Sequence, residues 1–398
     1  MIKFELKKTS KKMGKWKLIN KSLLIWQPEI EQNRDENKKG EKIAGFDLDG
    51  TLITTKTGNK FALDENDWKW WDEKVKERLK EEIGKGYKIV IITNQNGVDK
   101  GKLTVETLQK KLKQIIQDLG EDIIIMAALK EDHNRKPNVG IWNYLQKIYK
   151  CDEKESYYVG DAAGRPQGWR KMIMKKSSNQ NRLYDGKKDH SASDRKMALN
   201  VGLKFYTPEE FFFNDPVFPY NNCIMGFDPS SCQTVPIDIK VEKKQEMVLL
   251  VGLPSSGKSS FCKTHFPDHV RINMDTLKTS AKCIKKTQEA LKDGDSVIID
   301  NTNPDIKARL PYLQISRDYE VPIRCFWLQT PLELCNHLNL LRENISKGSS
   351  PHVPSVAFNT WLKRFIQPST EEGFSSVTTI PFSPNFNLVP RNIFLKWT

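Results

Sequence analysis

The second half of the chain can be organised around the stretch Gly252-Leu253-Pro254-Ser255-Ser256-Gly257-Lys258-Ser259. Its glycines, lysine and serine have the spacing G-x-x-x-x-G-K-[ST]. An apolar run of strand length, 246–251, precedes it, and the residues from Ser259 onward can open a helix. Glycines let backbone N–H groups close around a phosphate, and the helix N-terminus adds the positive end of a dipole. The pattern predicts a loop that binds a nucleoside triphosphate.

Individual roles follow from this loop. Lys258 would bridge the β and γ phosphates, and Ser259 would ligate Mg²⁺. The other residues expected to bind the nucleotide are Gly252, Ser255, Ser256, Gly257 and Ser260.

Charged residues further along the chain suit transfer of a phosphoryl group. Asp275 is the candidate base that would deprotonate an acceptor hydroxyl. Asp300 ends an apolar strand, where it would either hold the water shell of the metal or cap a helix. Arg309 and Arg342 are candidates for a cationic clamp on the transferred phosphoryl.

A second pattern lies in the first half, where an apolar strand ends in Asp47-Leu48-Asp49-Gly50-Thr51. Asp47 can attack phosphorus and form an aspartyl-phosphate, while Asp49 can protonate the leaving oxygen and later activate water. Mg²⁺ would be ligated by Asp47, the Asp49 carbonyl and Asp161. Thr93 offers a hydroxyl donor and Lys136 a cation for the phosphoryl oxygens.

Strands alternate with helices in both halves, which predicts two α/β domains built on parallel sheets. Polar residues collect after the strands, at the edge where open α/β sheets bind ligands. We divide the chain into a basic N-terminal arm, a first domain, a linker and a second domain, at 1–40, 41–213, 214–240 and 241–398. An apolar patch in the arm, 23–26, is expected to add one strand to the first domain.

Composition narrows the class of protein. The 398 residues carry a net charge of +14, which favours a polyanionic partner. Seven cysteines, an odd number without a C-x-x-C pair, argue against a disulfide framework or a structural zinc site. No apolar run is long enough to span a membrane, and the N-terminus lacks a secretory signal. We expect a monomer in a reducing compartment.

Several strings together resemble the bifunctional polynucleotide kinase 3′-phosphatase family, with its haloacid-dehalogenase phosphatase domain before its P-loop kinase domain. The strings are Gly45 to Thr55, Thr93-Asn94-Gln95, Arg135-Lys136-Pro137, Gly160 to Arg165, Asp300 to Pro304 and Arg342-Glu343. The resemblance implies removal of 3′-phosphates and ATP-dependent phosphorylation of 5′-hydroxyls on DNA during strand-break repair. It also implies a nuclear location, with mitochondria as a second one, and contacts with other repair proteins.

The chain departs from the family in three places. There is no room for the N-terminal forkhead-associated domain of animal members, so we do not expect recruitment through phosphorylated scaffold proteins. Leu340 stands where the family usually has a second arginine, which would slow the kinase. The basic stretch 165–189 is longer than usual.

That basic stretch carries a hypothesis of its own. Its cations and aromatic rings would suit a segment that grips a nucleic-acid strand beside the phosphatase cleft. A solvated loop is the equal alternative. The residues expected to contact nucleic acid are Arg165, Lys171, Lys175 and Lys176.

Other functions stay open at this point. The same chemistry could serve the repair of RNA ends, and a DNA-end phosphatase with a weak or inactive kinase half is a further reading. A small-metabolite kinase fused to a phosphatase fits the basic charge poorly. A DNA-end binder without activity fits poorly with the intact Asp47, Asp49, Lys258 and Asp275.

Overall fold

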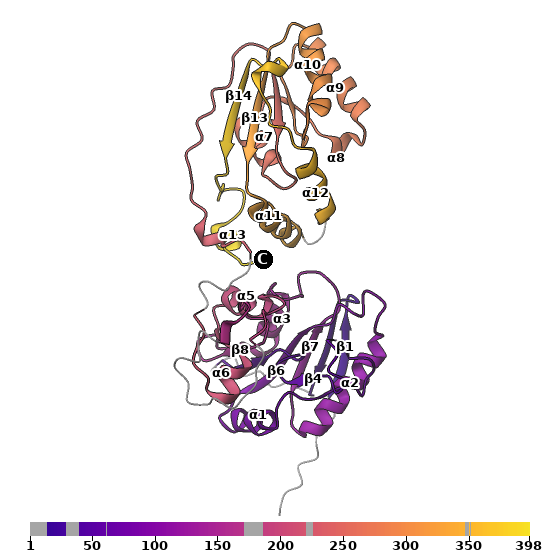
Figure 1. Cartoon of the computed structure of the whole chain (residues 1–398), viewed down its shortest axis with the longest axis vertical. Coiled ribbons are helices and arrows are strands. Elements are labelled where there is room, and N and C mark those ends of the chain that lie inside the picture. Colours follow the sequence, from indigo (N-terminus) through magenta and orange to yellow (C-terminus); the bar gives the residue numbers. More distant parts are fainter. Residues whose placement is uncertain are drawn as a thin grey trace, which may run out of the picture. The chain divides into compact units, whose positions relative to one another are not determined.

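A computed structural model describes residues 14–28, 40–60, 62–170, 186–219, 226–346, 350 and 352–398. The chain forms two compact units (Figure 1). Unit 1 comprises Met1–Met225 with Trp397–Thr398, and unit 2 comprises Gly226–Lys396. The boundary falls inside the stretch predicted as a linker. None of the described helices is long and apolar enough to cross a membrane.

Unit 1 contains a seven-stranded sheet whose central strands are parallel. Its order is β1 (Lys15–Ile19), β2 (Leu23–Gln27), β7 (Ile124–Ala128), β6 (Lys88–Asn94), β3 (Ile43–Phe46), β8 (Tyr157–Val159) and β9 (Lys204–Tyr206). The strands from β7 to β9 pair in parallel, whereas β1 and β2 are antiparallel to their neighbours. A separate hairpin joins β4 (Ile53–Thr54) and β5 (Lys69–Trp70). The predicted α/β fold is confirmed, with a mixed sheet in place of a wholly parallel one.

Alternate residues of each strand serve opposite faces of this sheet, because successive side chains of a strand point to opposite sides. In β6, Ile89 and Ile91 pack on one face and Val90 and Ile92 on the other. The first face is covered by α1 (Lys74–Gly84), α2 (Val105–Leu119) and α6 (Pro208–Phe213). The second is covered by α3 (Gly140–Tyr149) and α5 (Ser193–Val201). Both faces are buried, so the strands read as continuous apolar runs.

The N-terminal segment contributes a hairpin where a single strand was expected. The β1–β2 turn is also tied to the loop that follows β7. Ser22 accepts a hydrogen bond from the Asn134 side chain (3.1 Å) and donates one to Asp132, and its carbonyl accepts one from the Leu129 N–H (2.7 Å). The hairpin therefore braces the loop that carries Lys136.

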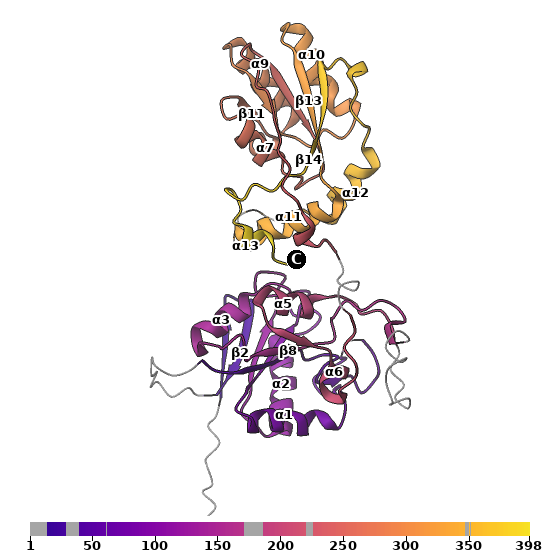
Figure 2. The same ribbon diagram turned by 90° about the vertical axis from the view of Figure 1, so that its left-hand side faces the viewer.

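Unit 2 is a parallel sheet of five strands. The order is β11 (Val270–Ile272), β12 (Val297–Ile299), β10 (Met247–Val251), β13 (Ile323–Gln329) and β14 (Ser376–Pro381). The Gly252–Ser259 loop follows the central strand, β10. Helix α7 (Lys258–His265) packs on one face, and α9 (Ser280–Lys292), α10 (Ile306–Asp318) and α12 (Ser355–Arg364) pack on the other. Figure 2 shows the sheet with these helices around it. The edge strands β11 and β14 were not among the predicted strands.

The hairpin gives a test of this packing. Replacing the buried Leu24 with alanine should lower the free energy of unfolding of unit 1 by about 2–5 kcal/mol, because it opens a cavity between β2 and the core. Leu18→Ala, at a residue that is 47% exposed, is the matched control and should change stability by less than about 0.5 kcal/mol. Urea unfolding, with hydrogen exchange of the β7 amides as the readout, measures the stability of both variants. Equal effects of the two variants would show that the hairpin is not part of the core.

Candidate active sites

The first site lies at the carboxyl ends of adjacent parallel strands of unit 1. Asp47 follows β3, Thr93 lies at the end of β6, and Asp161 follows β8. Lys136 comes from the loop after β7, and Asp194 lies at the start of α5. We call Asp47, Lys136, Asp161 and Asp194 the carboxylate site.

Lys136 is the central cation of the carboxylate site. Its Nζ lies 2.6 Å from Asp47 Oδ1 and 2.7 Å from Asp194 Oδ1. It also donates hydrogen bonds to the Ile92 carbonyl (2.8 Å) and the Tyr158 hydroxyl (2.9 Å). Burial alone lowers the pKa of Lys136, but the Asp194 and Asp47 carboxylates raise that pKa well above its usual value. Lys136 is therefore a buried ammonium that stays charged.

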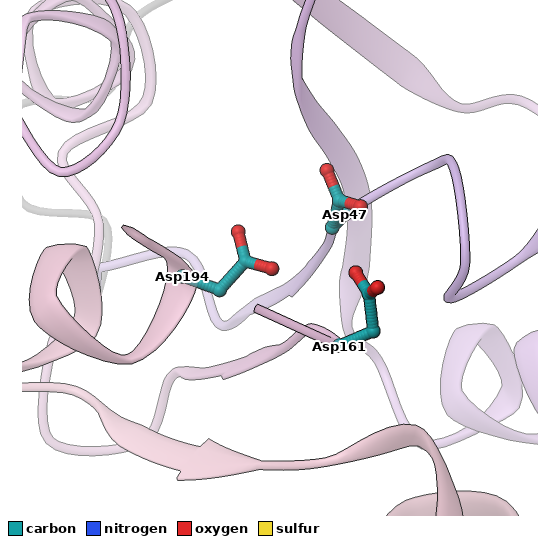
Figure 3. Close-up of side chains that lie close together, drawn as sticks. All are labelled: Asp47, Asp161 and Asp194. Carbon is teal, nitrogen blue, oxygen red and sulfur yellow. The ribbon is translucent and has the colours of Figure 1, made fainter. Parts of the chain in front are cut away.

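The three carboxylates of the site converge. Asp47, Asp161 and Asp194 each offer an oxygen within 4.8 Å of the others, and Figure 3 shows the Asp161 and Asp194 carboxylates turned toward Asp47. Burial raises the pKa of Asp47 to about 7 against the opposing charge of Lys136. Burial, with the Asp47 and Asp194 charges, raises the pKa of Asp161 well above its usual value. These carboxylates thus lack enough positive charge around them.

Two glycines allow this close approach. A Cβ atom at Gly50 would lie against the Asp161 carboxylate, and one at Gly160 would lie against that of Asp194. Gly50 also has a φ of 88°, a conformation that other residues rarely adopt. The glycine after the two aspartates is therefore needed for the position of Asp161.

A divalent cation fits the carboxylate site. Asp161 Oδ1 is buried and has no hydrogen-bond partner among the described residues. Three carboxylates facing one ammonium also leave surplus negative charge, and carboxylate oxygens are the ligands that Mg²⁺ prefers. Asp194 is already engaged, since its Oδ1 faces Lys136 and its Oδ2 accepts the Ala162 N–H (3.0 Å). Asp47 and Asp161 are the side chains best placed to hold the ion.

Asp49 lies beside the carboxylate site with its own partners. Lys111 Nζ lies 2.9 Å from Asp49 Oδ1, and Gln95 Nε2 lies 2.7 Å from Asp49 Oδ2. The same Gln95 amide donates to Thr93 Oγ1 (2.9 Å). Gln95 therefore links two residues that the sequence singled out, and Thr93 itself is buried.

The second site is a cavity of about 650 Å³ in unit 2. Lys258 lies at the start of α7, and its Nζ donates to the carbonyls of Gly252 (3.0 Å) and Leu253 (2.5 Å). Burial lowers the pKa of Lys258 to about 8. Of the other residues predicted to bind the nucleotide, five line this cavity: Ser255, Ser256, Gly257, Ser259 and Ser260. Gly252 contributes through the carbonyl that binds Lys258.

Asp300 lies close to the loop serine. Ser259 Oγ donates to Asp300 Oδ2 (2.8 Å), and Arg271 Nε donates to the same oxygen (2.7 Å). Arg271 also donates to Ser259 Oγ (2.8 Å), so a guanidinium joins the two groups. Asp300 does not cap a helix, because the N-cap of α10 is Asp305. The contact with Ser259 favours the other predicted role, beside the metal of a bound nucleotide.

The remaining predicted residues of the second site differ in outcome. Asp275, in the short helix α8 (Met274–Leu277), and Arg342, in α11 (Leu332–Ile345), line the cavity. Arg309 does not: it is fully buried and pairs with the Glu372 carboxylate at 2.7 and 2.8 Å. The prediction of Arg309 as a clamp was wrong, because its guanidinium is buried and already paired with a carboxylate. Nothing near Arg309 in the sequence indicates this partner, Glu372, which lies 63 residues away.

Arg165 does not fit its predicted role in binding nucleic acid. It is only 4% exposed and pairs with Asp189 (2.9 Å) and Glu209 (2.8 Å), and its guanidinium lies 4.1 Å from the centre of the Trp169 ring. Its charge is neutralised inside the unit. Lys171, Lys175 and Lys176 lie outside the described residues, so their predicted role stays a prediction.

Comparison with known proteins identifies the family. The family described as polynucleotide kinase 3 phosphatase matches residues 42–212, and an AAA domain matches 247–368. A bifunctional polynucleotide phosphatase/kinase of Schizosaccharomyces pombe is 39% identical over 354 residues, covering 87% of this chain and 81% of the relative. The chain belongs to the bifunctional polynucleotide phosphatase/kinase family.

A second relative supports the same family. It is a protein of Acanthamoeba polyphaga mimivirus whose name places it in this family, and it is 36% identical over 371 residues. The alignment covers 86% of this chain and 85% of the relative. Unit 1 therefore carries the phosphatase domain and unit 2 the kinase domain, in the order that the sequence predicted. The acidic site is consistent with Mg²⁺, and the kinase domain implies a nucleotide.

Sequence reasoning missed Asp194, Lys111, Gln95 and Arg271. Asp194 opens a helix, where acidic residues are ordinary, so nothing in the sequence distinguished it. Lys111 carried a detectable signal, because it lies on the apolar stripe of α2 formed by Leu108, Leu112, Ile115 and Leu119. A lysine within such a stripe needs a partner.

The Arg271 contact gives a prediction for the kinase unit. In EDTA, Arg271→Met should lower the free energy of unfolding of unit 2 by about 1–3 kcal/mol, because buried Asp300 would lose its charged partner. Mg–ADP should remove most of this difference, since a divalent cation beside Ser259 and Asp300 would replace the lost charge. Urea titration with hydrogen exchange of β10 and β12 peptides reports on this unit.

The matched control is Arg364→Met, which removes an exposed guanidinium paired with Asp305. This variant should lower the free energy of unfolding of unit 2 by less than about 1 kcal/mol, and by the same amount in EDTA and in Mg–ADP. If Arg271→Met lowers the free energy of unfolding by the same amount with and without Mg–ADP, Arg271 has no role at the metal position.

Proposed function

We propose that this chain removes 3′-phosphates from DNA ends and phosphorylates 5′-hydroxyl ends with ATP, as a repair enzyme of broken strands. The observation that carries the proposal is the pairing, in one chain, of a preformed carboxylate site with a loop-lined nucleotide cavity. The two relatives described above are named as bifunctional polynucleotide phosphatase/kinases, and the alignments with this chain cover 81% and 85% of their lengths. A net charge of +14 supports a polyanionic substrate.

In the phosphatase unit, Asp47 acts as the nucleophile. Its carboxylate forms a bond to phosphorus while the bond from phosphorus to the 3′-oxygen breaks, and the departing oxygen takes a proton from Asp49. Water then attacks the phosphorus and gives a proton to Asp49, while the bond from phosphorus to Asp47 breaks and inorganic phosphate leaves. Lys136 keeps Asp47 in place through the 2.6 Å ion pair. Mg²⁺, held by Asp47, Asp161 and the Asp49 carbonyl, would offset the negative charge of the phosphoryl group.

In the kinase unit, the chain supplies positioning and charge. Lys258 would exchange its loop carbonyls for the phosphates of ATP, and Ser259 would reach the Mg²⁺ that accompanies them. Asp275 would accept the proton of the 5′-hydroxyl as that oxygen bonds to the γ-phosphorus and ADP leaves. Arg342 is the only arginine among the described residues that line the cavity, so it would be the clamp on the transferred group.

Two variants separate the activities on a nicked duplex that carries a 3′-phosphate and a 5′-hydroxyl. With Mg²⁺ and ATP, Asp47→Ala should abolish only removal of the 3′-phosphate. Lys258→Ala should abolish only phosphorylation of the 5′-hydroxyl. Electrophoresis of both labelled ends measures each reaction, and circular dichroism checks that each variant is folded. Loss of both activities in either folded variant would contradict two independent sites.

The same assay on a nicked RNA duplex tests the substrate. We expect DNA ends to be processed at least about tenfold faster, corresponding to a preference of roughly 1.4 kcal/mol. A faster reaction on RNA would contradict the proposed DNA substrate and would indicate that the protein repairs RNA ends.

A further inference from the structure

Helix α2 buries a lysine where its pattern calls for an apolar side chain. The buried residues of the helix are Leu108, Lys111, Leu112, Ile115 and Leu119, which form one stripe at helical spacing. Only 7% of Lys111 is exposed. A buried ammonium costs free energy unless it is paired and hydrogen-bonded, so its position needs an explanation.

An ion pair at the end of the Lys111 side chain explains its buried position. The apolar stem of Lys111 follows the stripe, and its Nζ reaches Asp49 Oδ1 at 2.9 Å. The Asp49 side chain is 50% exposed, so the buried lysine stem carries its ammonium to a carboxylate that solvent can reach. The other oxygen of Asp49 accepts a hydrogen bond from Gln95, in the segment after β6.

Two different elements therefore hold the two oxygens of one carboxylate. With Lys111 on Oδ1 and Gln95 on Oδ2, rotation of the Asp49 side chain would break a contact. Each carboxylate oxygen can serve more than one partner, so these contacts still leave room for a proton. The arrangement fixes the orientation of the Asp49 carboxyl group.

We propose that Lys111 is a positioning residue of the phosphatase, which holds Asp49 in the orientation that protonates the leaving 3′-oxygen. The inference rests on the proposed function, in which Asp49 is the general acid. Nothing in the reaction consumes Lys111: the proton goes from Asp49 to the oxygen whose bond to phosphorus breaks. A correctly placed acid commonly contributes about 10²–10⁴-fold, and a small misplacement can cost about 10²-fold.

A purely structural ion pair would give a different result. If Lys111 only stabilised the fold, its loss would slow every substrate alike. If it positions the acid, the loss should depend on how much the leaving group needs a proton. An alkoxide, as in thymidine 3′-monophosphate, needs one, whereas p-nitrophenolate leaves readily without one.

The experiment compares kcat/KM for thymidine 3′-monophosphate and p-nitrophenyl phosphate in the full chain. Lys111→Met keeps the apolar stem and removes the charge. We expect it to lower kcat/KM about 10- to 100-fold on the nucleotide and less than about threefold on p-nitrophenyl phosphate. Lys111→Arg, which restores a charged donor, should recover most of the nucleotide activity. The small substrates limit any effect of Lys111 on binding a long strand.

Two controls make the outcome decisive. Lys113→Met removes the same charge from an exposed position of α2 and should change neither substrate. Asp49→Asn, which removes the acid itself, should lower kcat/KM on the nucleotide far more than on p-nitrophenyl phosphate. If Asp49→Asn is selective but Lys111→Met slows both substrates equally or neither, the positioning role is wrong. If Asp49→Asn itself is not selective, the proposed acid is wrong instead.

Discussion

One buried ammonium holds the phosphatase unit's chemistry together. Asp47, Asp161 and Asp194 come from different elements, and without a cation their charges would repel in a water-poor interior. Lys136 lies between Asp47 and Asp194 and offsets part of that repulsion. Its loop is anchored in turn by the N-terminal hairpin through Ser22. The position of the site thus depends on contacts that begin far from it in the sequence.

The kinase unit follows a similar principle with different residues. Lys258 binds carbonyl groups of its own loop, and Arg271 neutralises Asp300 beside Ser259. In both units a cation of the chain already binds acceptor groups of its own site, although in unit 1 Asp161 Oδ1 has no hydrogen-bond partner among the described residues. These internal partners limit the cost of burying charges before the ligand arrives. In the kinase unit the phosphates of the nucleotide would replace the carbonyls bound to Lys258, whereas in the phosphatase unit the Lys136–Asp47 pair would stay.

The sequence was informative where chemistry and secondary structure coincide. Asp47, Thr93 and Asp161 could be singled out because each lies at the end of an apolar strand, and parallel strands bring such ends to one edge. Arg309 and Arg165 were misjudged for the opposite reason. A cation in the sequence does not show its partner, and Glu372 and Glu209 neutralise these two from distant segments. Asp194 escaped notice because a helix start gives an aspartate an ordinary explanation.

Anomalous diffraction from crystals of the full chain soaked in Mn²⁺, which scatters more strongly than Mg²⁺, tests whether the three carboxylates around Lys136 bind a divalent cation. We predict one peak in unit 1 within about 2.5 Å of carboxylate oxygens of both Asp47 and Asp161, with Lys136 still bound to Asp47. A peak away from these two residues, or none at saturating Mn²⁺, would contradict the idea that Lys136 leaves a cation site among the three carboxylates.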